Sequence, residues 1–282
     1  MSNLTKLDTF GFLAITGRDA QKFLQGYTTC DLEDLDKGHV QTGAVCNIKG
    51  RMLCNFLVCR ESDGFLLRLR RSLIEPTIAF LSKYIVFSKA ALEDRSETLT
   101  CYGLTEAADG GPQALHEMSS QDSGRLLMTS AAPRFELWSQ DDLALGDLFP
   151  GGLFPEANGD PIKWEQDELA EGIVWVDEMS TEEYIPQMIN LHGLGGISFS
   201  KGCYLGQEIV ARMQYRGELK NRLHLGTCDA TVPRGAKVLN PDGKSAGTII
   251  AKVGHVFAAV LRAGESAYML EDGTPLKATE ST

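Results

Sequence analysis

The chain has 282 residues, which is long enough for one large domain or two to three modest ones, each with its own hydrophobic core. Hydrophobic residues make up 43% and charged residues 23% of the sequence, as in an ordinary globular protein rather than a disordered or fibrous one. The net charge of −11 argues against non-specific binding to nucleic acid or to an anionic membrane surface.

The N-terminal residues and the cysteines indicate in which compartment the protein is found. The first ten residues lack the basic stretch and the apolar run of a signal peptide, and the longest apolar runs, such as 256–261, are much shorter than the roughly 20 residues that cross a bilayer. The seven cysteines form no CxxC pair, and their odd number favours reduced thiols. We therefore expect a soluble, cytoplasmic protein without a membrane segment.

The N-terminal half predicts strands interrupted by two helices. Residues 10–16 form a β-favouring run, and Asp19 is expected to cap a short helix that ends at Gly26. Further strands are expected at 54–59, 65–69, 86–92, 98–104, 126–129 and 135–138.

A second helix is predicted shortly after the first pair of these strands. Ser72 and Glu75 have the spacing of a capping box, in which each side chain accepts a hydrogen bond from a backbone N–H at the start of a helix. Ile78, Leu81 and Ile85 then fall on one face of that helix, which we expect to pack on a sheet.

The C-terminal half has a different texture. Residues 149–161 carry three prolines and three glycines, which indicates a loop or crossover, and residues 164–171 predict a helix stopped by Gly172. After about residue 221 short strands alternate with turns, which favours a small C-terminal β-barrel. We therefore expect an α+β body over 1–221 with two interleaved lobes, and a barrel over 222–282.

The most informative segment runs from Lys201 to Glu208. It places Cys203 between Gly202 and Gly206, directly before a helix-forming run. The positive end of a helix and the nearby lysine are expected to lower the pKa of the cysteine, which makes it a candidate nucleophile or redox thiol. On composition alone, a single cysteine is more often a small buried apolar residue, and this alternative stays open.

The same octapeptide resembles the signature of the YgfZ family, a group related to the glycine-cleavage T-protein. Other stretches resemble that family as well, over about residues 8–225. These stretches are 15–17, 23–26, Asp31, 49–51, 83–89, 185–187 and 195–199.

The resemblance implies a GcvT-like fold, which is an α+β body of three lobes around a channel that takes folate, ending in a small β-barrel. It implies tetrahydrofolate or a related folate as the cofactor. It also implies a role in the assembly or repair of 4Fe–4S clusters in client enzymes, including enzymes that modify tRNA. These client enzymes would be the protein partners.

Residue roles follow from the same resemblance. The motif cysteine would be the functional thiol, surrounded by Lys201, Gln207 and Glu208. The folate would be held by aromatic rings and one carboxylate. The residues assigned to the folate in this way are Trp164, Phe10, Glu171 and Tyr204.

Two departures from the family patterns affect the expected chemistry. T-proteins need an aspartate after their Asn-x-x-Gly-Gly turn, and neither Cys54 nor Asn55 in the comparable stretch is a carboxylate. Aminomethyltransferase activity is therefore not expected. Glu171 is also shifted by one position from the glutamate that the family places two residues before a glycine.

Other constellations are less specific. The segment 201–222 has a local charge of +3, which would suit a folate polyglutamate tail or an acidic client, or would simply be a solvated face. Cys46, Cys54 and Cys59 have strand spacing and no nearby histidine in ligand register, so we expect them to fill the core rather than to bind a metal. No direct binding of nucleic acid is expected, since no RNA-binding motif is present.

Three functions remain possible on these grounds. The first is a folate-binding accessory factor for iron–sulfur enzymes that is not itself a conventional enzyme. The second is a folate-dependent one-carbon transferase or demethylase. The third is a non-catalytic scaffold that keeps the fold without the ligand.

Overall fold

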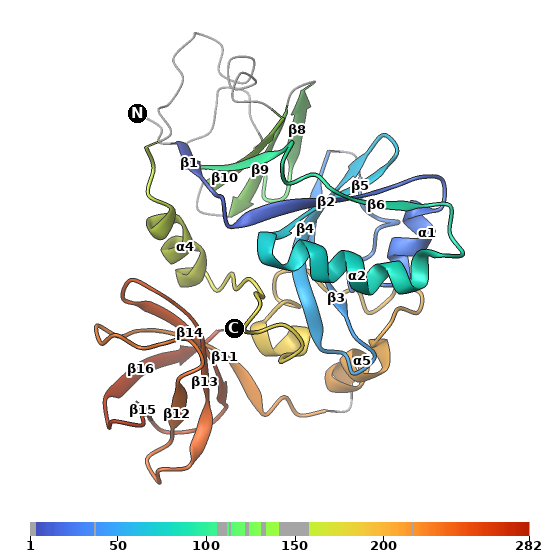
Figure 1. Ribbon diagram of the computed structural model, residues 1–282. Helices are drawn as coiled ribbons and strands as arrows, with labels where there is room; N and C mark the ends of the chain where they lie inside the picture. Colours follow the sequence, from blue (N-terminus) through green and yellow to red (C-terminus); the bar gives the residue numbers. More distant parts are fainter. Residues whose placement is uncertain are drawn as a thin grey trace.

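The computed structural model describes residues 4–36, 38–105, 112, 114–121, 124–130, 134–140, 158–215 and 217–281. In these ranges the chain forms two five-stranded antiparallel sheets and a closed six-stranded barrel. Figure 1 shows the three parts as three lobes: the barrel at the lower left, the sheet that contains residues 134–139 above it, and the sheet that contains residues 40–70 to the right.

One sheet is formed by N-terminal strands and has the strand order β3-β4-β5-β2-β6. The elements of this lobe are β2 (Phe10–Thr16), α1 (Ala20–Gln25), β3 (Val40–Cys46), β4 (Met52–Glu61), β5 (Gly64–Arg70), the 3-10 turn η1 (Arg71–Leu73), α2 (Ile74–Ile85) and β6 (Ala91–Asp94). Helices α1 and α2 pack on the same core, because Phe23, Leu24 and Leu81 are buried together with the strand residues. The face of α2 that the spacing predicts is therefore confirmed.

The other sheet is assembled from segments on either side of the first, in the order β1-β7-β10-β9-β8. Its strands are β1 (Leu4–Lys6), β7 (Thr100–Leu104), β8 (Met118–Gln121), β9 (Gly124–Ser130) and β10 (Arg134–Ser139). Because β1 pairs with β7 while β2 pairs with β5, consecutive strands belong to different sheets. The two sheets are thus interleaved along the sequence.

The last lobe is the β-barrel that the turn-rich C-terminal sequence predicts. Its strands are β11 (Asn221–Thr227), β12 (Lys237–Leu239), β13 (Ser245–Val253), β14 (Val256–Arg262), β15 (Tyr268–Leu270) and β16 (Pro275–Glu280). Val238, Phe257 and Leu261 fill its interior. Helix α4 (Pro161–Ala170) contacts both this barrel and β1, and so joins two lobes. The short elements η3 (Pro186–Ile189) and α5 (Gln207–Tyr215) precede the barrel.

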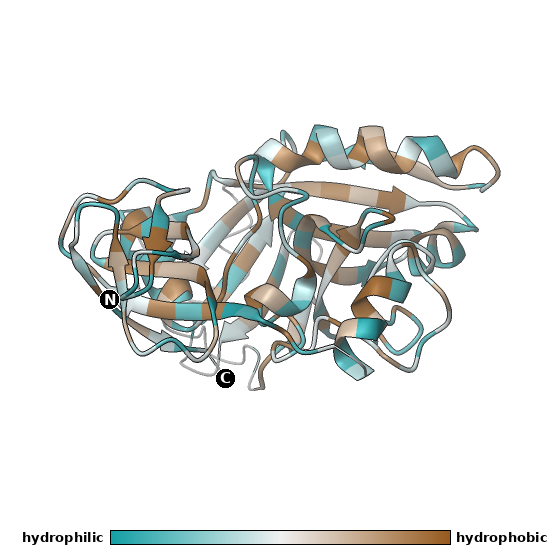
Figure 2. Ribbon diagram, turned by 90° about the horizontal axis from the view of Figure 1, so that it is seen from below, coloured by the Kyte–Doolittle hydropathy of each residue, from teal (hydrophilic) through white to brown (hydrophobic). Residues whose placement is uncertain are grey.

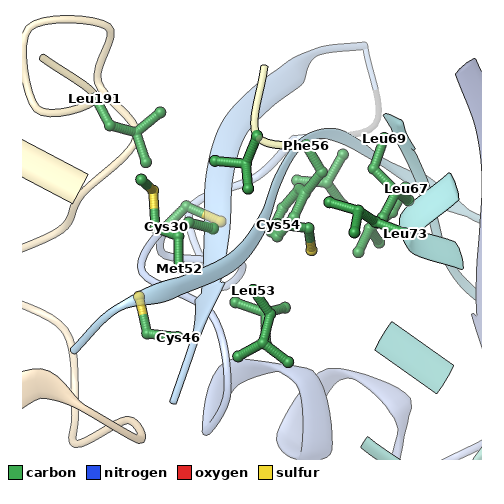
Figure 3. Packing of buried hydrophobic residues seen from close by; sticks show 14 of the residues in the cluster. Cys30, Cys46, Met52, Leu53, Cys54, Phe56, Leu67, Leu69, Leu73 and Leu191 are labelled. Carbon is green, nitrogen blue, oxygen red and sulfur yellow. The ribbon is translucent and has the colours of Figure 1, made fainter. Parts of the chain in front are cut away.

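Most cysteines are core residues. Cys30, Cys46 and Cys54 are buried among leucine, methionine and phenylalanine side chains of the largest cluster, as Figure 3 shows. Cys59 is buried in the cluster that lies between the two sheets. Thiols in such surroundings act as small apolar side chains, and burial raises the pKa of Cys54 to about 11.

A buried ion pair crosses from one sheet to the other. Arg68 of β5 and Glu136 of β10 are both completely buried, and the Arg68 Nε donates to Glu136 Oε2 over 2.9 Å. Trp138 Nε1 donates to the same carboxylate oxygen over 2.8 Å. Burial opposes the charge of Arg68, but Glu136, Cys101 and Glu168 together outweigh burial and raise the pKa of the guanidinium. The Arg68 guanidinium is therefore positively charged in the folded protein.

Three local predictions are wrong for identifiable reasons. The Asp19 carboxylate makes no cap bond to α1 and accepts instead from the Lys89 backbone N–H over 2.7 Å. Ser72 forms no capping box, since η1 precedes α2 and the Ser72 hydroxyl donates to Glu178 over 2.7 Å. The strand expected at 86–92 begins only at Ala91.

Figure 2 shows hydrophobic and hydrophilic residues alternating along α2, as expected for a helix with one face on a sheet. Of the crossover expected at 149–161, residues 149–157 lie outside the described residues, and so does Arg216. Among the helices that are described, none is both long and apolar enough to cross a membrane.

Candidate functional site

A cavity of about 450 Å³ lies where the two sheets, α4 and two loops meet. One wall comes from β3, β4 and β5, and another from β9 and the end of α4. Residues 173–175 and the glycine-rich loop 193–195 close it. This cavity is large enough for a small heterocyclic ligand and has both apolar and charged walls.

Glu168 is the buried acid of this cavity. Asp160 caps α4 by accepting from the Ile162 N–H, and Pro161 starts the helix, which turns Trp164 and Glu168 inward at a spacing of i and i+4. Glu168 Oε1 accepts from Trp175 Nε1 over 3.1 Å, whereas Oε2 has no hydrogen-bond partner among the described residues. Burial raises the pKa of Glu168 to about 7, although nearby Arg68 acts in the opposite direction.

Arg68 supplies a hydrogen-bond donor to the same cavity that contains the Glu168 acceptor. Its guanidinium lies 3.9 Å from the centre of the Phe10 ring and 4.2 Å from that of Trp175, so the two rings fix its plane. Its Nε and Nη2 bind Glu136, while Nη1 has no partner in the described part of the chain. The cavity wall thus holds one unpaired donor and one unpaired acceptor.

Asn55 positions the segment that carries Trp175. Its Nδ2 donates to the Val174 carbonyl and its Oδ1 accepts from the Val176 N–H, both over 2.8 Å. A side-chain amide offers a donor and an acceptor, whereas an ionised carboxylate offers acceptors alone, so an aspartate at this position would lose one of the two bonds. Asn55, which stands where T-proteins have a carboxylate, therefore has a structural role beside the cavity.

Glu171 lies at the rim. It ends α4, and its carboxylate accepts from the Ser130 hydroxyl of β9 and pairs with Arg134 over 2.8 Å. Both the predicted Glu171 and the unpredicted Glu168 line the cavity, but of the two only Glu168 has a buried oxygen without a hydrogen-bond partner among the described residues.

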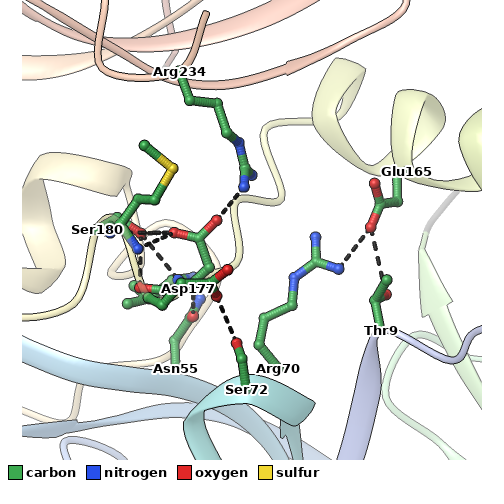
Figure 4. Close-up of polar contacts among 11 residues, drawn as sticks. Thr9, Asn55, Arg70, Ser72, Glu165, Asp177, Ser180 and Arg234 are labelled. Atoms are coloured by element: carbon green, nitrogen blue, oxygen red, sulfur yellow. Dashed lines mark hydrogen bonds and ion pairs between the residues drawn. The ribbon is translucent and has the colours of Figure 1, made fainter.

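A polar cluster outside the cavity holds the lobes together (Figure 4). The Asp177 carboxylate pairs with Arg234 of the barrel and accepts from the Ser180 hydroxyl over 2.7 Å. Arg70 pairs with Glu165 of α4 over 2.6 Å. These contacts connect the barrel and α4 to the sheet that carries Arg68.

Of the aromatic residues predicted to hold folate, none lines the cavity, although Phe10 lies directly behind it. Trp164 is buried against Gly103 of β7 and the Arg134 guanidinium, because a tryptophan here fills the space that the glycine leaves. Phe10 contacts the Arg68 guanidinium and lies edge-on to Trp175. Tyr204 is buried beneath Lys201, whose Nζ lies 5.3 Å from its ring centre. The geometry favours Trp175 as the ring that a ligand would meet.

Sequence reasoning missed three residues at the cavity: Arg68, Glu168 and Trp175. A signal for Arg68 was present, since an arginine inside an apolar strand run must be paired when that strand is buried. The signal for Glu168 was its spacing from Trp164, which places both side chains on one helix face. Trp175 follows the helix in an irregular segment, and no periodicity marks it.

Cys203 is on the surface, as its proposed role requires. It is the one exposed cysteine of the seven, and it lies in a loop attached to α1 and to the turn between β3 and β4. The Leu205 N–H donates to the Gly26 carbonyl over 3.0 Å. Gly206 has a φ of +84°, and a Cβ there would meet the Asn47 carbonyl at 2.4 Å, so glycine is required.

Cys203 is not among the residues that line the cavity, so the thiol and the proposed ligand site are two separate places. The chain that borders the cavity at 193–195 continues to the thiol loop. On the way the Ser198 N–H donates to the Thr29 carbonyl over 2.8 Å. Cavity and thiol therefore lie at two ends of one ordered segment.

Lys201 anchors this loop rather than facing the sulfur. Its Nζ is directed inward and donates to the carbonyls of Thr28 and Cys30 over 2.9 and 2.6 Å. Burial lowers the pKa of the Lys201 ammonium. Gln207 and Glu208 form the first turn of α5, where the Gln207 N–H donates to the Tyr204 carbonyl over 3.1 Å and the Glu208 side chain is exposed.

Some of the positively charged side chains of residues 201–222 are buried or ion-paired within the fold. Lys201 is buried, and Arg222 pairs with Glu280 over 2.6 Å. Arg212 and Lys220 are exposed. No group of three or more histidine, cysteine or acidic side chains suitable for a metal ion occurs among the described residues.

Comparison with known proteins identifies a matching family model and similar proteins. The family model of the GCVT N-terminal domain matches residues 2–126. The tRNA-modifying protein YgfZ of Sodalis glossinidius is 36% identical over 231 residues, covering 78% of this chain and 70% of its own. The protein of the same name from Escherichia coli O157:H7 is 33% identical over 264 residues, covering 89% and 81%.

Among solved structures, the glycine cleavage system aminomethyltransferase T from Bartonella henselae matches with a TM-score of 0.73. The match covers 100% of this chain and 85% of the other at 12% identity, so it speaks for the fold alone. The predicted GcvT-like α+β body with a small C-terminal β-barrel is confirmed.

The raised pKa of Glu168 predicts a pH-dependent stability. Because the folded protein holds the proton up to about pH 7, whereas an unfolded glutamate releases it near 4.5, stability is lost as the pH rises through this window. Glu168→Gln removes the effect, so the unfolding free energy of the variant relative to the natural protein should rise by about 3 kcal/mol between pH 4 and pH 8. Urea unfolding at both pH values measures it.

The matched control is Glu208→Gln, which removes an exposed carboxylate of α5. A stability difference for Glu168→Gln that is the same at both pH values would show that Glu168 is not held protonated by its surroundings.

Proposed function

Because the chain belongs to the YgfZ family, we propose that it is a folate-binding accessory protein for the assembly or repair of 4Fe–4S clusters in client enzymes, including enzymes that modify tRNA. The relatives carry the name of tRNA-modifying proteins. The observation that carries the folate part is the cavity with its unpaired donor on Arg68 and unpaired acceptor on Glu168.

The residues of the cavity fit a tetrahydrofolate. The pyrimidinone edge of a pterin presents N–H donors next to a carbonyl, which complement the free Glu168 oxygen and the free Arg68 nitrogen. Trp175 provides a flat apolar wall for the ring system. A buried carboxylate and guanidinium that are each left with an unpaired atom are costly unless a ligand satisfies them.

The chain's own residues bind and orient the ligand in this proposal. A bound folate would supply a one-carbon carrier or a reductant. Asn55 keeps Trp175 in place, and Phe10 together with Glu136 fixes the plane of Arg68. The exposed thiol of Cys203 is the group available to a client protein, and Gln207 and Glu208 shape its surroundings.

Free cysteines support a cytoplasmic location. All seven are unpaired, as in proteins of a reducing compartment.

Aminomethyl transfer is not proposed, because both polar atoms of Asn55 are engaged by backbone groups. A one-carbon transferase on this fold would use Glu168 as its acid or base, since it is the cavity carboxylate whose buried oxygen has no partner among the described residues.

Folate binding predicts a saturable change in tryptophan fluorescence on titration with tetrahydrofolate. Trp175→Phe should abolish most of the change because its ring would contact the ligand, while Trp164→Phe, the matched control at a residue outside the cavity, should preserve it. At pH 8, above the raised pKa of Glu168, Glu168→Gln should weaken binding at least about tenfold, as expected for loss of a charged hydrogen-bond acceptor. If Trp164→Phe removes the signal and Trp175→Phe does not, the proposed cavity is wrong.

The thiol part of the proposal predicts the outcome of complementation. In a strain that lacks its own family member, the natural chain should restore an iron–sulfur-dependent tRNA modification, measured by mass spectrometry of nucleosides. Cys203→Ala should lose this rescue because no other exposed thiol is present, whereas Cys228→Ala, which alters a buried cysteine, should keep it. Full rescue by Cys203→Ala would refute the role of the thiol.

A further inference from the structure

The end of α2 presents large apolar side chains to solvent. Phe87 is 96% exposed and Val86 is 68% exposed, directly after the helix ends at Ile85. Tyr84 is partly exposed beside them. We call the surface formed by residues 83–89 and Lys22 the α2-end surface. Large apolar side chains that gather on a surface, rather than lying scattered, mark interaction sites.

A groove accompanies this surface. It has a volume of about 240 Å³ and lies between α1 and the end of α2, with Phe87, Tyr84 and Tyr27 in its walls. The rings of Phe23 and Tyr27 are 5.0 Å apart, and those of Tyr27 and Tyr84 are 5.0 Å apart. Because the rings stack on one another, the groove is preformed rather than opened by a ligand.

The surface is positively charged in a chain of net charge −11. Lys22, Lys83 and Lys89 are exposed, and no ion pair within the described ranges includes any of them. The Asp19 carboxylate at the groove is already engaged by the Lys89 backbone N–H and by Arg18. An acidic partner would therefore meet unpaired ammonium groups.

The groove is continuous with the loop of the exposed thiol. Gly26 lines the groove, and its carbonyl accepts from the Leu205 N–H, two residues after Cys203. On the other side of that loop, Gly206 packs on the turn that contains Ile48, which is 76% exposed, and Lys49, which is also exposed. Apolar side chains and lysines thus lie on both sides of the thiol loop.

We propose that the α2-end surface is the docking site for a folded client protein whose own surface is acidic and inserts an apolar side chain into the groove, next to Cys203. This inference rests on the proposed function, to which it adds the place and chemistry of the client contact. The chain as a whole carries a net charge of −11, which repels the phosphate backbone of RNA and favours a protein over RNA as the occupant.

Two double variants test the two components of the surface. Val86→Ser with Phe87→Ser removes the apolar contact, and Lys83→Glu with Lys89→Glu reverses the charge. All four side chains are exposed, so the fold should be kept. The matched controls are Ile162→Ser, an exposed apolar residue of α4, and Lys277→Glu, an exposed lysine of the barrel.

The readouts are rescue of tRNA modification in the strain without its own family member, tetrahydrofolate affinity, and affinity for a purified 4Fe–4S tRNA-modifying enzyme of that strain. Both surface variants should lose at least about tenfold in affinity for the enzyme and lose rescue, with folate affinity unchanged. The lysine variant should also reduce the salt dependence of binding. Both controls should behave like the natural chain.

The remaining outcomes separate the two proposals. If the natural chain rescues and the surface variants rescue equally well, the docking site is wrong while the proposed function stands. If the natural chain itself does not rescue, the proposed function fails and the docking site falls with it. If the variants weaken binding of purified tRNA in a gel-shift assay but not of the enzyme, RNA is the occupant and the docking proposal is overturned.

Discussion

The ion pair between Arg68 and Glu136 is the constraint on which the centre of the protein depends. Two sheets contribute one charge each, and neither charge has access to water. Removing a charge from water is costly, and the attraction of the partner offsets this only with close geometry and further hydrogen bonds. Trp138 satisfies Glu136, and the rings of Phe10 and Trp175 surround Arg68. The relative position of the two sheets is therefore closely specified.

The cavity follows from that constraint. With Nε and Nη2 held by Glu136, Arg68 can present only Nη1 to a ligand, in a fixed plane. Glu168 reaches the same space from α4, which is joined to the sheet by the pair of Arg70 with Glu165. A site on rigid elements with its charges already oriented loses little entropy when a ligand binds. The thiol loop is positioned separately, by the buried Lys201.

Much of the fold could be predicted from the sequence because local patterns determine it. The strand at 10–16, the helix face of Ile78, Leu81 and Ile85, and the turn-rich barrel all match the structure. The cavity could not be predicted in the same way, since Arg68, Glu168 and Trp175 lie far apart in sequence and meet only when two interleaved sheets close. The sequence predicts that Trp164 contacts the folate and that Lys201 lies beside the thiol. A motif does not show which way a side chain points, and in the structure both side chains point elsewhere.

The most direct test of the folate cavity is a crystal structure of the natural chain soaked with a chemically stable reduced folate. Electron density for the pterin should lie between the two sheets, with its N–H edge on the free oxygen of Glu168, its carbonyl at Nη1 of Arg68 and its ring against Trp175. Density at another place, or an empty cavity at saturating folate, would contradict the account.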